Sequence, residues 1–433
     1  MSYELKEGVE RVEGTKDTYL QVSPTRNIQG ANFSNGVQVY RWAVDDNTFW
    51  HPKDSYFRIR VALTKADGIT PVDDGDEIAL NMGFVAELFQ SLAFSINGVV
   101  INRLADFVPQ IDMLDKRYRH SADWLNNFGR STALYNPSFV ERRALTSSTT
   151  PPFASALEFD WYLPMGIFHC APLPCGDYQV SMVPQPDSVV QVRAVQRTKA
   201  TPAPTDYKFT VVDAYFMVRT TAYGEPIQAA TYMLDMEQIQ CQAESIQAGA
   251  GVQQKLLSAQ ESTKALIAAL QDQRAGTDPL YSASFFKLYD APQIGTFSQE
   301  LQLSRLYIEY AGETKPQPDW VGGVGVYGVG GFYDFTNQLY MESFSNAYRE
   351  RMGTCGMSPE SKVDHVARGS FYWFNWKKQP GNFSTRVYAN IQMASPVPGG
   401  VDNNRLLLFC VYSTVAQITV HGNRAVDVRV LNV

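Results

Sequence analysis

One glycine-rich segment has the spacing of a phosphate-binding motif. Residues 323–328 match Gly-x-Gly-x-x-Gly, the fingerprint in which glycines let a dinucleotide phosphate reach the N-terminus of a helix. That fingerprint functions only between a strand and a helix. Here Pro316 and Pro318 precede the motif and further glycines follow it. We therefore interpret residues 321–331 as a surface or contact loop, not as a cofactor site.

Two groups of residues could ligate a metal or carry a nucleophile. His169, Cys170 and Cys175 could bind zinc, but no second ligand pair lies at zinc-finger spacing, so we favour buried structural thiols. Cys355 could be paired with His365, although nothing in their spacing selects them. The sequence therefore predicts no catalytic residue, no metal ligand and no cofactor.

Adjacent carboxylates occur at Asp45 and Asp46 and again at Asp73 and Asp74. Such pairs could bind calcium, which prefers hard oxygen ligands. Both pairs lie in sequences typical of turns, where aspartate side chains usually accept hydrogen bonds from the turn backbone. We expect them to stabilise turns.

The densest aromatic segment is residues 371–376, FYWFNW, which could form a platform for a sugar or a base. Strand alternation would place alternate members on opposite faces: Phe371, Trp373 and Asn375 on one, and Tyr372, Phe374 and Trp376 on the other. Since both faces are aromatic, both need cover from a sheet, a loop or another subunit. We favour packing over ligand binding.

The composition narrows the class of protein. The chain has 433 residues, 45% of them hydrophobic and 12% aromatic, with a net charge of −7. An acidic chain without basic runs gives no basis for gripping nucleic acid, so we expect no sequence-specific binding to it. The five cysteines are an odd number and fit reduced thiols in a reducing compartment. We find no signal peptide and no segment long enough to span a bilayer.

Most of the chain has the pattern of short strands separated by turns. Strand patterns recur at residues 37–42, 56–63, 91–96, 157–163, 178–182, 189–192, 209–218, 301–310, 370–376, 384–393, 406–411, 417–420 and 426–430. A helix is predicted from Pro109 to Gly129, a second over residues 253–274, and a third over residues 335–348. This pattern favours β-sandwiches with a few helices in the connections between strands.

Two landmarks recur about half a chain length apart. Residues 91–98, SLAFSING, resemble residues 305–312, RLYIEYAG, at an offset of 214. Residues 159–161, FDW, resemble residues 374–376, FNW, at an offset of 215. Two landmarks in the same order at nearly the same offset predict a duplicated domain.

The ordered landmarks resemble those of the double jelly-roll major capsid proteins of tailless icosahedral DNA viruses, such as polinton-like viruses and virophages. The segments that carry the resemblance are residues 55–61 before Asp67 and Gly68, residues 88–98 with the helix that follows, and residues 371–376, 386–391, 406–412 and 418–420. The resemblance implies an all-β fold of two tandem jelly-roll β-sandwiches. It implies a homotrimer that forms a pseudo-hexameric capsomer and tiles an icosahedral shell in the virion.

The resemblance also implies neighbouring capsomers as partners, with penton and minor capsid proteins. Assembly would take place inside the host cell. Alternative interpretations are a two-domain jelly-roll glycan-binding protein, a hydrolase on the same scaffold, and a minor capsid or spike protein. We predict an N-terminal arm or edge segment at residues 1–35, a first jelly roll at 36–222, a linker at 223–240 and a second jelly roll at 241–433.

Overall fold

The structure is a computed structural model, and it describes most of the first half of the chain and the main strands of the second. The described residues are 16–29, 32–120, 124, 127–135, 141–143, 157–197, 205–223, 229–247, 251–260, 262–272, 303–315, 371–376, 385–393, 404–421 and 425–431. The glycine-rich loop at 321–331, the expected helix at 335–348, and Cys355 with His365 lie outside this set.

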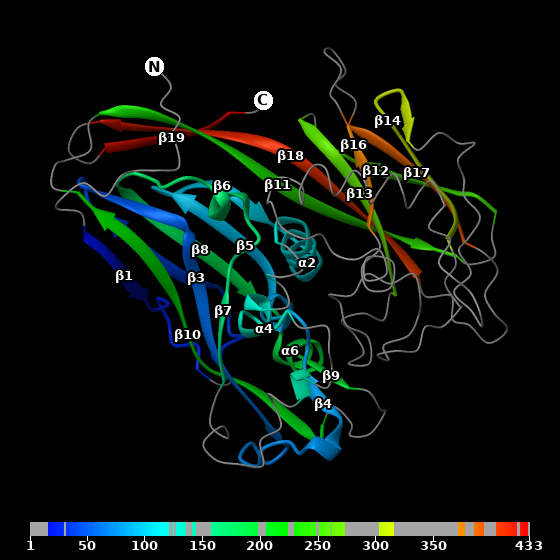
Figure 1. The fold of residues 1–433 in the computed structure, drawn as a ribbon, viewed down its shortest axis with the longest axis horizontal. Coiled ribbons are helices and arrows are strands. Elements are labelled where there is room, and N and C mark those ends of the chain that lie inside the picture. Colours follow the sequence, from blue (N-terminus) through cyan, green and yellow to red (C-terminus); the bar gives the residue numbers. More distant parts are fainter. Residues whose placement is uncertain are drawn as a thin grey trace.

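The first half of the chain forms a complete eight-stranded jelly roll (Figure 1). One sheet has the order β1 (Lys16–Val22), β10 (Tyr207–Ala222), β3 (Thr48–Lys65) and β7 (Leu157–Trp161). The facing sheet has the order β2 (Gln38–Val44), β8 (Gly176–Pro184), β5 (Phe89–Ile96) and β6 (Val99–Leu104). A short pair, β4 (Ile78–Leu80) and β9 (Val195–Arg197), extends the roll. All these pairings are antiparallel.

The second half repeats the same topology. One sheet has the order β11 (Ala230–Ile246), β18 (Asn404–His421), β13 (Thr263–Asp272) and β16 (Phe371–Asn375), with β19 (Ala425–Leu431) paired to β18. The other has the order β12 (Gln253–Ser258), β17 (Arg386–Met393), β14 (Leu303–Tyr310) and β15 (Glu313–Lys315). The predicted double jelly roll is confirmed.

The two sequence landmarks occupy equivalent places in the two rolls. Strands β5 and β14 each end in a two-residue turn, and both residues of each turn have positive φ: 49° and 81° at Asn97 and Gly98, 56° and 82° at Ala311 and Gly312. That backbone twist matches two antiparallel strands, so both turns make tight hairpins. Strands β7 and β16 both flank the third strand of their sheet. The predicted duplication is confirmed.

Aromatic side chains fill the space between the two sheets of the first roll. The Trp42 ring on β2 stacks on Phe216 of β10, with ring centroids 5.3 Å apart. The Trp50 ring on β3 stacks on Phe94 of β5, also at 5.3 Å. All four side chains are almost fully buried, and such pairs add to the stabilisation that their buried area provides.

The sheet that contains β18 is buried on both faces. Alternate residues such as Ile267, Trp373 and Phe409 pack into the large core shared with the first roll. Their neighbours, including Tyr372 and Phe374, pack into the separate core of the second roll. The aromatic segment at 371–376 is therefore packed on both sides, as predicted, and the continuous apolar run in β18 follows from the same double burial.

The helices lie in the connections, as expected for this fold class. They are α1 (Phe84–Glu87), α2 (Val108–Arg119), α4 (Phe128–Ser131) and α6 (Asp187–Arg193), with 3-10 turns η2 (Asp74–Asp76) and η3 (Gly166–His169). Helix α2 has a proline in its first turn, as predicted, but ends at Arg119 and not at Gly129. No helix among the described residues is long and apolar enough to cross a bilayer.

Two local predictions are wrong. Within residues 253–274, predicted as a helix, Gln253–Ser258 and Thr263–Asp272 form strands β12 and β13. Residues 189–192, predicted as a strand, lie in α6. In β13 a run of alanine, leucine and isoleucine is buried on both faces, and an uninterrupted apolar run carries no period by which strand and helix can be told apart. The high helix propensity of those residues was overridden by pairing with β16 and β18.

Two segments at the edges of the predicted domains also belong to sheets. Residues 16–22, placed in an arm or edge segment, form edge strand β1 against β10. Residues 230–240, placed in the linker 223–240, belong to β11, which pairs with β18 along its whole length. In both segments, the backbone groups that face the neighbouring strand are satisfied by these ladders.

The two rolls meet where α2, η3 and β6 of the first contact β11 of the second (Figure 1). The Gln238 side chain on β11 donates a hydrogen bond from Nε2 to the Ile101 carbonyl oxygen of β6, at 3.3 Å. The guanidinium of Arg405 on β18 lies 6.0 Å from the centre of the Phe107 ring, which precedes α2. At Gly166 the two backbones approach so closely that an added Cβ atom would lie 2.4 Å from the Glu237 carbonyl oxygen.

We predict that Gly166→Ala destabilises the protein because its methyl group would overlap backbone atoms of β11. Overpacking of this kind costs about 1–3 kcal/mol, which corresponds to a fall of several degrees in melting temperature. Gly75→Ala is the matched control, since a Cβ at Gly75 meets nothing within 4 Å. Thermal unfolding followed by circular dichroism measures both. Equal melting temperatures for Gly166→Ala and the wild type would contradict tight contact between the rolls.

Candidate functional site

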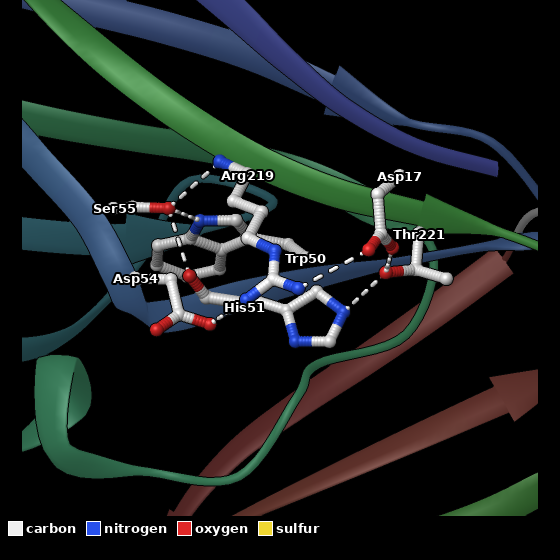
Figure 2. A network of polar contacts seen from close by, with 7 residues as sticks. All are labelled: Asp17, Trp50, His51, Asp54, Ser55, Arg219 and Thr221. Atoms are coloured by element: carbon white, nitrogen blue, oxygen red, sulfur yellow. Dashed lines mark hydrogen bonds and ion pairs between the residues drawn. The ribbon is translucent and has the colours of Figure 1, made fainter. Parts of the chain in front are cut away.

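A network of polar side chains joins β1, β3 and β10 on the first sheet (Figure 2). Its centre is Arg219 on β10, whose guanidinium contacts Asp54 Oδ2 at 2.5 Å and Asp17 Oδ2 at 3.2 Å. Asp17 lies on the edge strand β1, and Asp54 lies where β3 departs from regular pairing with β10. One arginine therefore ties an edge strand and an irregular strand to the same neighbour.

Ser55 closes the irregular part of β3. Four residues of β3 lie between His51 and Tyr56, opposite the single residue Val218 of β10, so β3 carries three extra residues here. The buried Ser55 hydroxyl accepts hydrogen bonds from Trp50 Nε1 at 2.8 Å and from the Arg219 backbone nitrogen at 3.0 Å. It donates to the His51 carbonyl oxygen at 2.8 Å. The hydroxyl thus uses its whole hydrogen-bonding capacity to hold the insertion in place.

His51, Thr221 and Asp17 are the part of the network closest to a catalytic arrangement. Thr221 Oγ1 donates to Asp17 Oδ1 at 2.6 Å, because a carboxylate can only accept. Consequently His51 Nε2, 2.7 Å from the same oxygen, acts as the donor. A base that activates a hydroxyl must accept its proton, and a triad carboxylate must orient the imidazole. Neither condition holds here, so the arrangement fixes β1 to β10 and supports no nucleophilic chemistry.

The electrostatics of this network favour a neutral imidazole beside a charged carboxylate. Partial burial, reinforced by the Arg219 charge, lowers the pKa of His51 from its ordinary value of 6.5. Hydrogen bonds from Thr221 and then Arg219 lower the pKa of Asp17 from 3.8. At neutral pH the network therefore pairs one cation, Arg219, with two carboxylates.

A second polar cluster lies buried between α2, β7 and η3. The Asp112 carboxylate accepts hydrogen bonds from Trp161 Nε1 at 3.0 Å and from the Tyr135 hydroxyl, and lies 3.3 Å from Lys116 Nζ. Lys116 also donates to the Tyr162 carbonyl oxygen at 2.6 Å. Burial raises the pKa of Asp112 in spite of the Lys116 charge, and raises that of Tyr135 well above 10. These side chains are enclosed in the core, so the cluster anchors α2 to the sheet.

The residues weighed as metal ligands do not converge. His169 Nε2 lies 3.3 Å from Asp115 Oδ2, while Cys170 and Cys175 are buried and free of disulfides. Burial raises the pKa of the Cys175 thiol, which disfavours the thiolate that zinc requires. Among the described residues, no three His, Cys, Asp or Glu side chains gather as a metal site. Cys241 and Cys410 are likewise buried and unbridged.

The paired carboxylates behave as turn residues. Asp73 caps η2, and its backbone nitrogen donates to Asp76 Oδ2 at 2.7 Å in a reciprocal capping box. The Asp45 carbonyl oxygen accepts a hydrogen bond from the Thr48 backbone nitrogen at 3.1 Å, which closes the turn between β2 and β3. Asp73 therefore stabilises a turn, and Asp45 lies in one.

The outer face of the first sheet is rich in tyrosine and arginine. Alternation places Tyr19, Tyr56, Tyr215 and Met217 on the side away from the core. Arg58 forms a bidentate pair with Asp160, at 2.6 and 2.9 Å, and donates to the Tyr56 hydroxyl at 3.1 Å. This face could not be predicted from the sequence, because its residues come from four strands whose register cannot be read from the chain.

Three solved structures with a similar fold come from viruses. VP54 of PBCV-1, fitted into a reconstruction of the virophage Sputnik, has a TM-score of 0.55 and 10% identity, with coverage of 99% of this chain and 100% of VP54. A chain of the Sputnik virophage has a TM-score of 0.59 and 10% identity, with coverage of 99% and 91%. A chain of the PBCV-1 capsid has a TM-score of 0.53 and 10% identity, with coverage of 99% and 100%.

No family model matches the sequence, and no curated protein matches it either. Since the identities are near 10%, the likeness lies in the fold, and it extends over nearly the whole chain. The chain therefore has the double jelly-roll architecture that its sequence resembles.

We predict that acidification loosens the network around His51. Because the folded-state pKa of His51 is lowered, the unfolded chain binds a proton more readily, and this contribution to stability is lost as pH falls through 6.5 and below. The melting temperature of the wild type should fall between about pH 7.5 and about pH 5, and should fall less in His51→Gln, which keeps a donor without titrating.

Scanning fluorimetry across that range compares the wild type with His51→Gln and with His421→Gln, a control at an exposed histidine on β18. The control should retain the wild-type dependence. The same pH dependence in His51→Gln would contradict the prediction. The Asp17 contribution is separate, since it is lost only as pH falls below 3.8.

Proposed function

We propose that this chain is a major capsid protein, a structural subunit of the shell of an icosahedral DNA virus. The observation that carries the proposal is the pair of complete jelly rolls joined side by side through one sheet buried on both faces. Two similar domains held in a fixed relation give one chain two nearly equivalent outer edges. A block built from such chains can tile a flat surface.

Three copies would supply six similar domains, which is a pseudo-hexameric capsomer, and cyclic symmetry would close the trimer. The fold likeness to chains in the PBCV-1 capsid and the Sputnik virophage supports this proposal. The partners would be other copies in the trimer, neighbouring capsomers, and penton and minor capsid proteins. The site of action would be the virion.

We also propose that the chain divides between Ala222, the end of β10, and Ala230, the start of β11. The first jelly roll would then include β1. An N-terminal arm would be limited to residues 1–15, outside the described part of the chain, and would contact a neighbouring subunit.

The test is the mass and the assembly of the purified protein. Native mass spectrometry should give a particle of three times the 48.5 kDa chain mass, and electron microscopy should reveal shells or hexagonal sheets. A chain that lacks residues 1–15 should still form trimers, because β1 is retained, while assembling fewer shells. A wild-type protein that stays monomeric at high concentration, or that binds glycans as a monomer, would contradict the proposal.

A further inference from the structure

Because the two rolls have the same topology, each sheet face in one roll has an equivalent face in the other. Strands β11, β18, β13 and β16 of the second roll correspond in sheet order to β1, β10, β3 and β7 of the first. In the second roll, the face of this sheet that points away from its own core is covered by the first roll. Ile267 and Phe409 on that face are fully buried, and Trp373 is 3% exposed.

The corresponding face of the first roll has no such cover within the described residues. Tyr19 on β1 is 51% exposed, and Tyr56, Tyr215 and Met217 are only partly buried. Tyrosine and arginine are the residues most enriched at the centres of protein interfaces. In the second roll this sheet face is thus buried against the first roll of the same chain, whereas the equivalent face of the first roll is exposed.

Two arginines on the open face are already held by carboxylates. Arg58 is held by Asp160 and Glu158, and Arg219 is held by Asp17 and Asp54. Each of these two guanidinium groups would keep a carboxylate partner when water is removed, so neither arginine would be buried unpaired. Fixed side chains also lose less conformational entropy on binding. Both features lower the free-energy cost of burying this face against another protein surface.

We propose that the outer face of the β1–β10–β3–β7 sheet docks the second jelly roll of another copy of the chain, at its β14–β15 edge. This inference rests on the self-assembly proposed above. The contact within one chain supplies the geometry: β11 of the second roll receives the edge strand β6 of the first, through Gln238 and the Ile101 carbonyl oxygen. Strand β15 holds the equivalent edge position in the second roll.

A contact between unlike surfaces of identical chains is heterologous, and it closes a ring when its rotation divides a full turn. The internal contact between first and second roll would thus alternate around the ring with the contact between copies. Each chain would offer one face and one edge. Every second roll would then contact the first roll of its own chain and the first roll of the next copy.

Photo-cross-linking tests the position of the partner directly. The full-length chain, with benzoylphenylalanine in place of Tyr19 and no other change, is irradiated as an equal mixture of isotopically labelled and unlabelled protein. The expected product joins position 19 to residues 303–315 of a different copy. Cross-links from position 19 to position 19, or to the first roll of another copy, would overturn the proposal.

Surface variants give an independent readout. Tyr19→Glu combined with Tyr215→Glu should lower the trimer association constant by at least about tenfold, because charge replaces interface tyrosines. Ile69→Glu is the control, since Ile69 is 82% exposed in the turn after β3 and lies away from this face. Circular dichroism of each variant reports folding, and the cross-link decides the matter if the double variant is unfolded.

The outcomes separate this inference from the proposed function. Wild-type protein that remains monomeric would overturn both. Trimers that persist unchanged in a folded double variant, or that cross-link elsewhere, would overturn only the assignment of this face. Cross-links to a protein other than this chain would also overturn it.

Discussion

The sheet formed by β11, β18, β13 and β16 is apolar on both faces, and the rest of the structure depends on covering it. Leu406 and Leu408 point into the second core while Leu407 and Phe409 point into the core shared with the first roll. Exposing either face would cost about 25 cal/mol for each Å² of apolar surface returned to water. The cover that the first roll provides consequently stabilises the second roll, and we expect the two rolls to behave as one unit. Two domains in a fixed relation are what a tiling subunit needs.

Polar groups in the molecule serve this arrangement. Asp112 and Lys116 anchor α2, the helix that lies between the rolls, and Arg219 fastens the edge strand β1 to β10. Ser55 absorbs an insertion that would otherwise leave backbone groups unsatisfied. By residue type alone, each of these polar groups could belong to a catalytic or binding site. Their geometry shows that they position strands.

The sequence predicted the architecture because its signals were local. The turns at Asn97–Gly98 and Ala311–Gly312 require positive φ, and alternation in β2 and β3 marks one buried face. Prediction failed at β13, where double burial removes alternation, and at β11, whose polar residues pair with β18 across about 170 positions of sequence. The outer tyrosine face depends on the register of β1, β10 and β3, which is fixed by tertiary pairing. No pattern within a single strand contains that information.

The most direct test of the account is whether the two rolls unfold together. Pulsed hydrogen exchange with mass spectrometry, carried out along a urea titration, reports protection of β3 in the first roll and β13 in the second within the same molecules. Because the doubly buried sheet couples the cores, both segments should lose protection at the same urea concentration. Loss of protection in β13 at lower urea, with β3 still protected, would contradict the claim that the two rolls form a single cooperative unit.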